Sequence, residues 1–208
     1  MRIISLIIFQ LITYISLGQN ISRINKELKL PDSLNNTKEV RFYRGFGTTN
    51  NTTLLRIYQN KSKKWKVEFY EHWSMTNNEK GFNLTKKNLN PKTDIALIYA
   101  KLKLNYILDL PNMSEISWKF TKKGKIVKEK RKTNSKGDYK EEYIFSGRNK
   151  ISILDGIGFK VQISDNKTNE FEFSNYEGYL KHFPNVDKLI LYSEIVNILS
   201  EEFDIWKD

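Results

Sequence analysis

Apolar and polar residues alternate with a period of two over much of the chain, a pattern typical of β-strands with one buried face. In the first part of the chain, the alternation predicts strands around residues 40–42, 54–58 and 65–69. The polar turn at residues 59–64 is short enough to predict an antiparallel hairpin. A β-meander therefore opens the expected fold.

The same alternation returns in the second half of the chain and predicts further antiparallel strands. Residues 116–120 predict one strand, and the basic segment that follows predicts a long exposed hairpin with its return strand at residues 143–145. Residues 159–163 and 171–173 predict a second hairpin around a polar turn. The second half of the chain is thus expected to contribute two antiparallel hairpins.

Helical spacing replaces the alternation in two longer segments. Asn90 and Pro91 predict a helix start, with asparagine as the N-cap and proline at the first helical position. Asp94 is expected in the first turn, where the helix dipole favours a carboxylate. Apolar residues then share one face, so a helix is predicted at about residues 91–104.

The second long helix is predicted at about residues 186–203, with Asn185 as its cap and apolar residues at three- and four-residue spacing. A shorter helix is expected after Ser174, because Ser174 and Glu177 have the spacing of a capping box. Together these elements predict an α+β fold. We expect an antiparallel β-meander sheet of about seven to nine strands, packed on one face by the helices at about 91–104 and 186–203.

The first 18 residues differ from the rest of the chain because they are almost wholly apolar. A basic start followed by about 15 mostly apolar positions is typical of a cleavable signal peptide, whereas a membrane-spanning helix needs roughly 20. The small residues Ser16 and Gly18 suit signal peptidase, so residues 1–18 are predicted to be removed by cleavage between Gly18 and Gln19. We therefore expect an exported protein, periplasmic or extracellular, without a transmembrane segment after processing.

The mature chain is expected to consist of a lead-in segment, residues 19–38, and a single α+β domain, residues 39–208. The sequence contains no cysteine, so neither a lipid anchor on the signal nor a disulfide framework is expected. Stability must come from a hydrophobic core, and a chain of this size can bury roughly 70% of the surface that its unfolded form exposes.

Charge is distributed unevenly along the chain. Residues 119–150 contain 12 Lys and Arg against 4 Asp and Glu, whereas residues 165–208 contain 4 against 10. A basic surface attracts anionic partners, although lysines on an exposed hairpin also serve solubility and block edge pairing. The candidate binding residues of this basic segment are Lys122, Lys123, Lys125, Lys128, Lys130, Arg131 and Lys132. Trp118, Tyr139 and Tyr143 lie nearby for stacking. An anionic surface or an envelope protein is the expected partner, and nucleic acid is not.

The sequence contains no nucleophile elbow, phosphate-binding loop or dinucleotide fingerprint. The histidines have no ligand-spaced partners, so we expect a strand-end surface position for His72 and a structural role near a helix C-terminus for His182. No catalytic residue, metal or cofactor is therefore expected. Carboxylates that meet only in space remain an alternative, with Glu68, Glu71 and Asp155 as the candidates.

The Ser-Leu-Gly-Gln signal junction, the pair Asp155-Gly156 and the segments 159–163, 171–175 and 179–184 form a further pattern with the final helix. In a chain rich in Lys, Asn and Ile, this pattern resembles uncharacterised exported proteins of Bacteroidota-type bacteria, and the resemblance implies no activity. The sequence thus predicts an exported, non-enzymatic binding or interaction module for an anionic envelope component or a protein partner. A secreted hydrolase that uses a carboxylate pair is the alternative.

Overall fold

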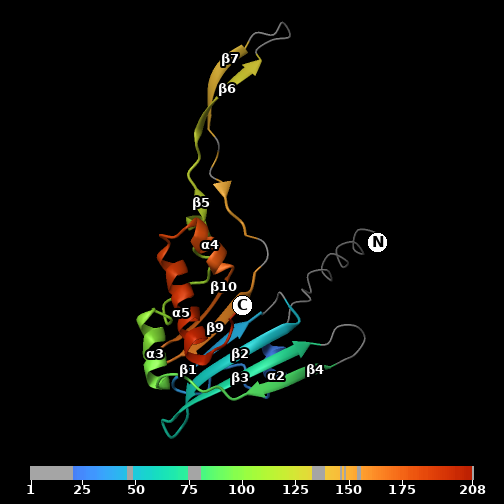
Figure 1. Cartoon of the computed structure of the whole chain (residues 1–208), viewed down its shortest axis with the longest axis vertical. Helices are drawn as coiled ribbons and strands as arrows, with labels where there is room; N and C mark the ends of the chain where they lie inside the picture. The colour runs from blue at the N-terminus through green and yellow to red at the C-terminus, as the bar shows by residue number, and fades with distance from the viewer. Residues whose placement is uncertain are drawn as a thin grey trace, which may run out of the picture.

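The computed structural model describes residues 21–45, 49–74, 81–132, 139–145, 147, 149–153 and 156–207. Within these residues the chain forms four α-helices and ten β-strands (Figure 1). The proposed cleavage site at Gly18 and Gln19 lies outside the described residues, as does Asp155. No helix in the described part of the chain is long and apolar enough to cross a membrane.

A six-stranded antiparallel sheet forms the body of the protein, with the order β10-β9-β1-β2-β3-β4. Its strands are β1 (Glu39–Arg44), β2 (Asn51–Gln59), β3 (Trp65–Ser74), β4 (Phe82–Lys87), β9 (Gly158–Ser164) and β10 (Thr168–Ser174). The first four strands follow one another as a meander, and the β9–β10 hairpin joins the sheet beside β1. The expected α+β class is confirmed.

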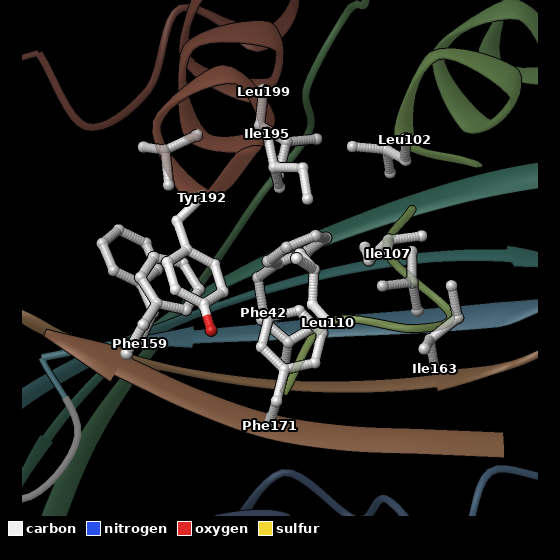
Figure 2. Close-up of a cluster of buried hydrophobic side chains, with 14 of the residues drawn as sticks. Phe42, Leu102, Ile107, Leu110, Phe159, Ile163, Phe171, Tyr192, Ile195 and Leu199 are labelled. Atoms are coloured by element: carbon white, nitrogen blue, oxygen red, sulfur yellow. The ribbon is translucent and has the colours of Figure 1, made fainter. Parts of the chain in front are cut away.

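Two helices, α3 (Ile95–Leu104) and α5 (Asp187–Phe203), cover one face of the sheet. Figure 2 shows Leu102 of α3 and Ile195 of α5 above Phe42 and Phe171 of the sheet, and all four side chains are wholly buried. Full burial of side chains of this kind contributes about 1.5–3 kcal/mol each. The shorter helix α4 (Tyr176–His182) lies next to α5. The predicted packing of one sheet face by two main helices is therefore confirmed.

The opposite face of the sheet is partly covered by the segment that precedes β1. Helix α2 (Ile21–Glu27) places Ile24 against a second apolar cluster that includes Tyr43, Leu54 and Tyr70. These three residues alternate along β1, β2 and β3 with residues of the main core, because successive side chains of a strand point to opposite faces. The predicted lead-in segment is thus packed against the sheet over its described part.

Helix α3 begins four residues later than the sequence predicts. Its N-cap is Asp94, whose carboxylate accepts hydrogen bonds from the backbone N–H groups of Ala96 (2.8 Å) and Leu97 (3.3 Å). The expected start at Pro91 is wrong because the following residues are held elsewhere. The backbone N–H and the hydroxyl of Thr93 both donate to the carboxylate of Glu202, at 3.1 and 2.8 Å.

The predicted caps of the other two helices are also wrong. Helix α4 has Asn175, not Ser174, at its N-cap, and the Asn175 side chain donates to the carbonyl of Ile153 (3.0 Å) instead of capping the helix. Helix α5 begins after Val186 rather than Asn185, without a side-chain cap. In both cases the helix begins one residue later than the capping sequence predicts, and at α4 the side chain of the N-cap residue is engaged in a tertiary contact instead.

Residues 116–120, predicted as a strand, form a turn and the 3₁₀-helix η1 (Ser117–Lys119). Ile116 and Phe120 are both buried while Trp118 is 70% exposed, an arrangement that a helical turn allows and an alternating strand does not. Edge strand β4 was not predicted, because none of its residues is buried. The described residues form ten strands, of which six make the main sheet and four make two separate two-stranded ladders.

Candidate binding surface

A buried aromatic residue, Phe120, anchors the basic segment to the body of the protein. Its ring packs against those of Tyr179 (4.6 Å between centroids) and Phe183 (5.8 Å) at helix α4. Directly after it, β5 (Thr121–Lys122) pairs with β8 (Asn149–Lys150), and the N–H of Ile151 donates to the carbonyl of Phe120 (3.1 Å). The chain therefore leaves and re-enters the body at one fixed stem.

Beyond this stem, β6 (Ile126–Lys132) and β7 (Tyr139–Phe145) form an antiparallel hairpin. Each strand has seven residues, which corresponds to a length of roughly 20 Å. Figure 1 shows the hairpin extending away from the helices and the main sheet. The predicted long exposed hairpin is confirmed.

The register of the hairpin gathers aromatic and basic side chains on one face. Residues directly opposite one another share a face, so Lys128 lies beside Tyr143, and Ile126 beside Phe145. We call this the aromatic face, and it consists of Ile126, Lys128, Lys130, Tyr139, Glu141, Tyr143 and Phe145. Its apolar members are strongly exposed: 77% for Phe145, 71% for Tyr143, 66% for Tyr139 and 63% for Ile126.

The opposite face of the hairpin is more mixed. Val127 and Ile144 lie opposite one another near the stem, and Val127 is 45% exposed. Further along, Arg131 approaches Glu142 at 3.9 Å, an exposed pair that contributes little to stability. Both faces of the hairpin are therefore apolar near the stem, but the exposed aromatic rings lie only on the aromatic face.

The predicted binding residues are divided by the fold. Lys128 and Lys130 lie on the aromatic face, and Lys128 forms an ion pair with Glu141 on the same face. Arg131 lies on the other face. Lys122 belongs to the stem, and Lys123 and Lys125 follow it in the connection to β6. The backbone of Lys132 ends β6, but its side chain lies outside the described residues.

Sequence reasoning recognised the tyrosines of this surface but missed its apolar part. Phe145 was predicted only as part of a strand, and Ile126 was not singled out within the segment predicted to be an exposed hairpin. Trp118, the third predicted stacking residue, is exposed at the foot of the stem, with the ammonium of Lys119 5.6 Å from its ring. One feature of the sequence could have predicted the exposure of these apolar residues: no further apolar segment is predicted to pack against the hairpin.

The two candidate carboxylates of the hydrolase alternative that lie within the described residues, Glu68 and Glu71, do not come together. Glu68 and Glu71 are three residues apart on β3 and so point to opposite faces of the sheet. Glu68 accepts hydrogen bonds from Arg56 and Lys86, both at 2.9 Å, and Glu71 accepts one from Lys87 at 2.6 Å. Both side chains are therefore engaged in cross-strand ion pairs.

Glu68 is one member of a row of charges on the α2 side of the sheet. Glu39 accepts hydrogen bonds from the Nε atoms of Arg41 and Arg56, each at 2.8 Å, and Arg56 in turn donates to Glu68. Burial alone would raise the pKa of Glu39, but the hydrogen bonds from Arg56 and Asn36 and the charge of Arg41 outweigh it and lower the pKa. Every charged side chain in this row is paired with another member of the row, which suits a structural role.

His72 is buried, and its predicted surface position is wrong. Helix α2 covers it, and its Nε2 contacts the carboxylate of Glu27 while its ring stacks on Phe82 (5.6 Å). Burial would raise the pKa of Glu27, but Arg23 and His72 lower it overall. His182 is exposed in the last turn of α4, in agreement with the sequence. No cluster of three or more potential metal ligands occurs among the described residues.

A separate pocket of about 320 Å³ lies on the body of the protein, between the start of α4 and the C-terminal segment. Arg44, Phe159, Glu177 and Trp206 are among its lining residues, and Glu68 and Glu71 are not. The buried Oδ1 of Asn175, another lining residue, has no hydrogen-bond partner within the described structure, but it lies directly against Gly156. That atom is thus covered by backbone. Comparisons of the chain with protein-family models, curated proteins and solved structures find no match.

Proposed function

We propose that this protein is exported and acts as a non-enzymatic binding module, with the β6–β7 hairpin as its binding element. The partner is an anionic component of the cell envelope or an anionic protein. The observation that carries the proposal is the aromatic face, on which lysines of β6 lie beside exposed rings of β7 along a hairpin that projects from the body.

A purely solvated hairpin is the simplest competing explanation, and it accounts for the lysines but not for the rings. Exposed lysines favour solubility, whereas exposed Phe145, Tyr143 and Ile126 leave a contiguous apolar surface in water. Tyrosine and lysine side chains side by side suit a partner that has both negative charge and apolar or planar groups. Because basic residues outnumber acidic ones in residues 119–150, the proposed partner is negatively charged.

Export is proposed from the sequence alone. Residues 1–18 have the basic start and the mostly apolar stretch of a cleavable signal peptide, and the small residues Ser16 and Gly18 suit signal peptidase.

Charge reversal tests the electrostatic part of the proposal. The triple variant Lys128→Glu, Lys130→Glu, Arg131→Glu is expected to lose retention on vesicles that contain phosphatidylglycerol or on a polyanionic resin. Retention of the unaltered protein should fall as salt rises toward about 1 M, where the screening length is about 3 Å. Salt-insensitive binding that is unchanged by the triple variant would refute the electrostatic role.

Two further variants control this experiment. Because reversed charges beside Glu141 and Glu142 could open the hairpin, the neutral variant Lys128→Gln, Lys130→Gln, Arg131→Gln should weaken retention in the same direction. The triple variant Lys61→Glu, Lys64→Glu, Lys66→Glu changes the net charge equally at exposed positions of the body. It should retain binding, and an equal loss would show that only the total charge matters.

A further inference from the structure

The two long edges of the β6–β7 hairpin are open. Among the described strands, β6 pairs only with β7, so each presents an unpaired row of backbone N–H and C=O groups along its outer edge. Such an edge is a template for another strand. A two-stranded hairpin is at best marginally stable in water, and a third strand adds both hydrogen bonds and side-chain cover.

The apolar residues near the stem favour a strand over a flat surface as the occupant. Ile126 and Phe145 lie on the aromatic face, and Val127 and Ile144 lie on the other. A membrane or a flat polymer can cover only one of these faces. An added strand continues both faces at once, because its own side chains alternate between them.

The outer edges of β6 and β7 differ in charge, and this difference determines which kind of added strand each edge favours. On the aromatic face, the charged residues of β6 are Lys128 and Lys130. On the other face, β6 carries Arg131 and one acidic residue, Glu129. β7 is acidic at Glu141 and Glu142. Opposite charges directly across a strand pair are favourable and like charges are unfavourable. A second copy of β6 would place basic residues against basic residues, so an acidic strand is the complementary occupant.

We propose that the outer edge of β6 receives an extended acidic segment of a partner protein as a third strand of the hairpin. This inference rests on the proposed function and names the partner class for the same surface. The lysines of the edge then act as a filter, because they oppose neutral or basic strands and admit an acidic one. Backbone hydrogen bonds supply the affinity, and the Lys128 and Lys130 positions supply the specificity.

A peptide that alternates glutamate and valine over seven residues, acetylated and amidated at its ends, is a suitable probe for the full chain. We expect the peptide to bind and to slow the amide hydrogen exchange of β6. A matched peptide with lysine in place of glutamate should not bind. The variant Lys128→Gln, Lys130→Gln should weaken binding of the acidic peptide, whereas Lys61→Gln, Lys64→Gln on the body should not.

Backbone methylation separates strand addition from simple charge attraction. One copy of the acidic peptide is N-methylated at every valine and another at every glutamate, so that each loses the N–H groups of one strand edge while keeping its charge. Strand addition predicts that one of the two copies binds about tenfold or more weakly, because its hydrogen bonds to β6 are lost.

Each other outcome overturns a defined part of the argument. If both methylated copies bind like the parent peptide, strand addition is wrong while anionic binding through the hairpin stands. If no acidic peptide binds but phosphatidylglycerol vesicles do, the partner is a lipid surface and the strand proposal is again wrong. If neither probe binds at low salt, the proposed function fails together with this inference.

Discussion

The substitution Glu39→Gln tests whether the buried row of charges holds the lead-in segment and the sheet together. The side chains of Glu39 and Arg41 are wholly buried, and that of Arg56 is 10% exposed. Glutamine has nearly the same shape as glutamate but carries no charge. Its carbonyl oxygen can take the place of Oε1, which accepts from both Nε atoms, and its amide group then faces Asn36, which donates to Oε2 of Glu39. The variant therefore leaves two buried cations without their shared anion.

The structure sets the size of the expected effect. Removing one partner of a buried ion pair costs about 3–5 kcal/mol. Arg56 keeps its hydrogen bond to Glu68 (2.9 Å), and Arg41 keeps one to the carbonyl of Pro31 (2.6 Å), so the lower end applies. We expect a loss of about 3 kcal/mol in the free energy of unfolding, a large part of the 5–15 kcal/mol typical of a domain.

Urea denaturation followed by circular dichroism measures this loss. With a urea dependence of about 2 kcal/mol per molar, the unfolding midpoint should fall by roughly 1.5 M. Glu172→Gln is the matched control, because Glu172 lies on the same sheet with a half-exposed side chain paired to Lys160. The control should lose no more than about 1 kcal/mol. Equal effects of the two substitutions would refute the reasoning.

The same pair of proteins has a defined pH dependence. The pKa of Glu39 is below its ordinary value of 4.5 in the folded protein. Its contribution to stability is therefore complete above pH 4.5 and is lost as the pH falls through the lower folded pKa. The difference in stability between the unaltered protein and Glu39→Gln should shrink in that acidic range, and a difference that grows there would contradict the assignment.

Two further predictions concern the N-terminal segment. Glu27→Gln removes the anionic partner of buried His72, so hydrogen exchange should become faster in α2 and stay unchanged in the central strands; Arg23→Gln, which removes only an exposed pair, should have a smaller effect, and equal protection in all three proteins would contradict the role of the contact. Mass spectrometry of the secreted or periplasmic fraction should find Gln19 at the N-terminus, and an intact Met1 would contradict the proposed processing.

Local sequence was sufficient where alternation coincided with a buried face. The strands around Phe42, Leu55 and Phe171 were predicted correctly because alternating apolar side chains of each strand are buried in the main core. The start of α3 was not predictable in this way. It depends on Glu202, which lies more than 100 residues later and holds Thr93 in place.

The candidate site shows the same division. The lysines and tyrosines of the hairpin were recognised as residue types, but their arrangement was not. That Lys128 lies beside Tyr143 and that Arg131 lies on the other face follow from the register of the hairpin. Register is set by the pairing of two strands and cannot be read from either strand alone.

By itself, the sequence determined the α+β class, the central strands, the two long helices and the basic hairpin, because each depends on a period within one segment. The tertiary structure decided the start of α3, the burial of His72 beneath α2 and the exposure of Phe145 on the hairpin. Each of these depends on whether a distant segment supplies a covering surface or a hydrogen-bond partner. Periodicity indicates which side of an element is apolar, and only the packed chain decides what covers it.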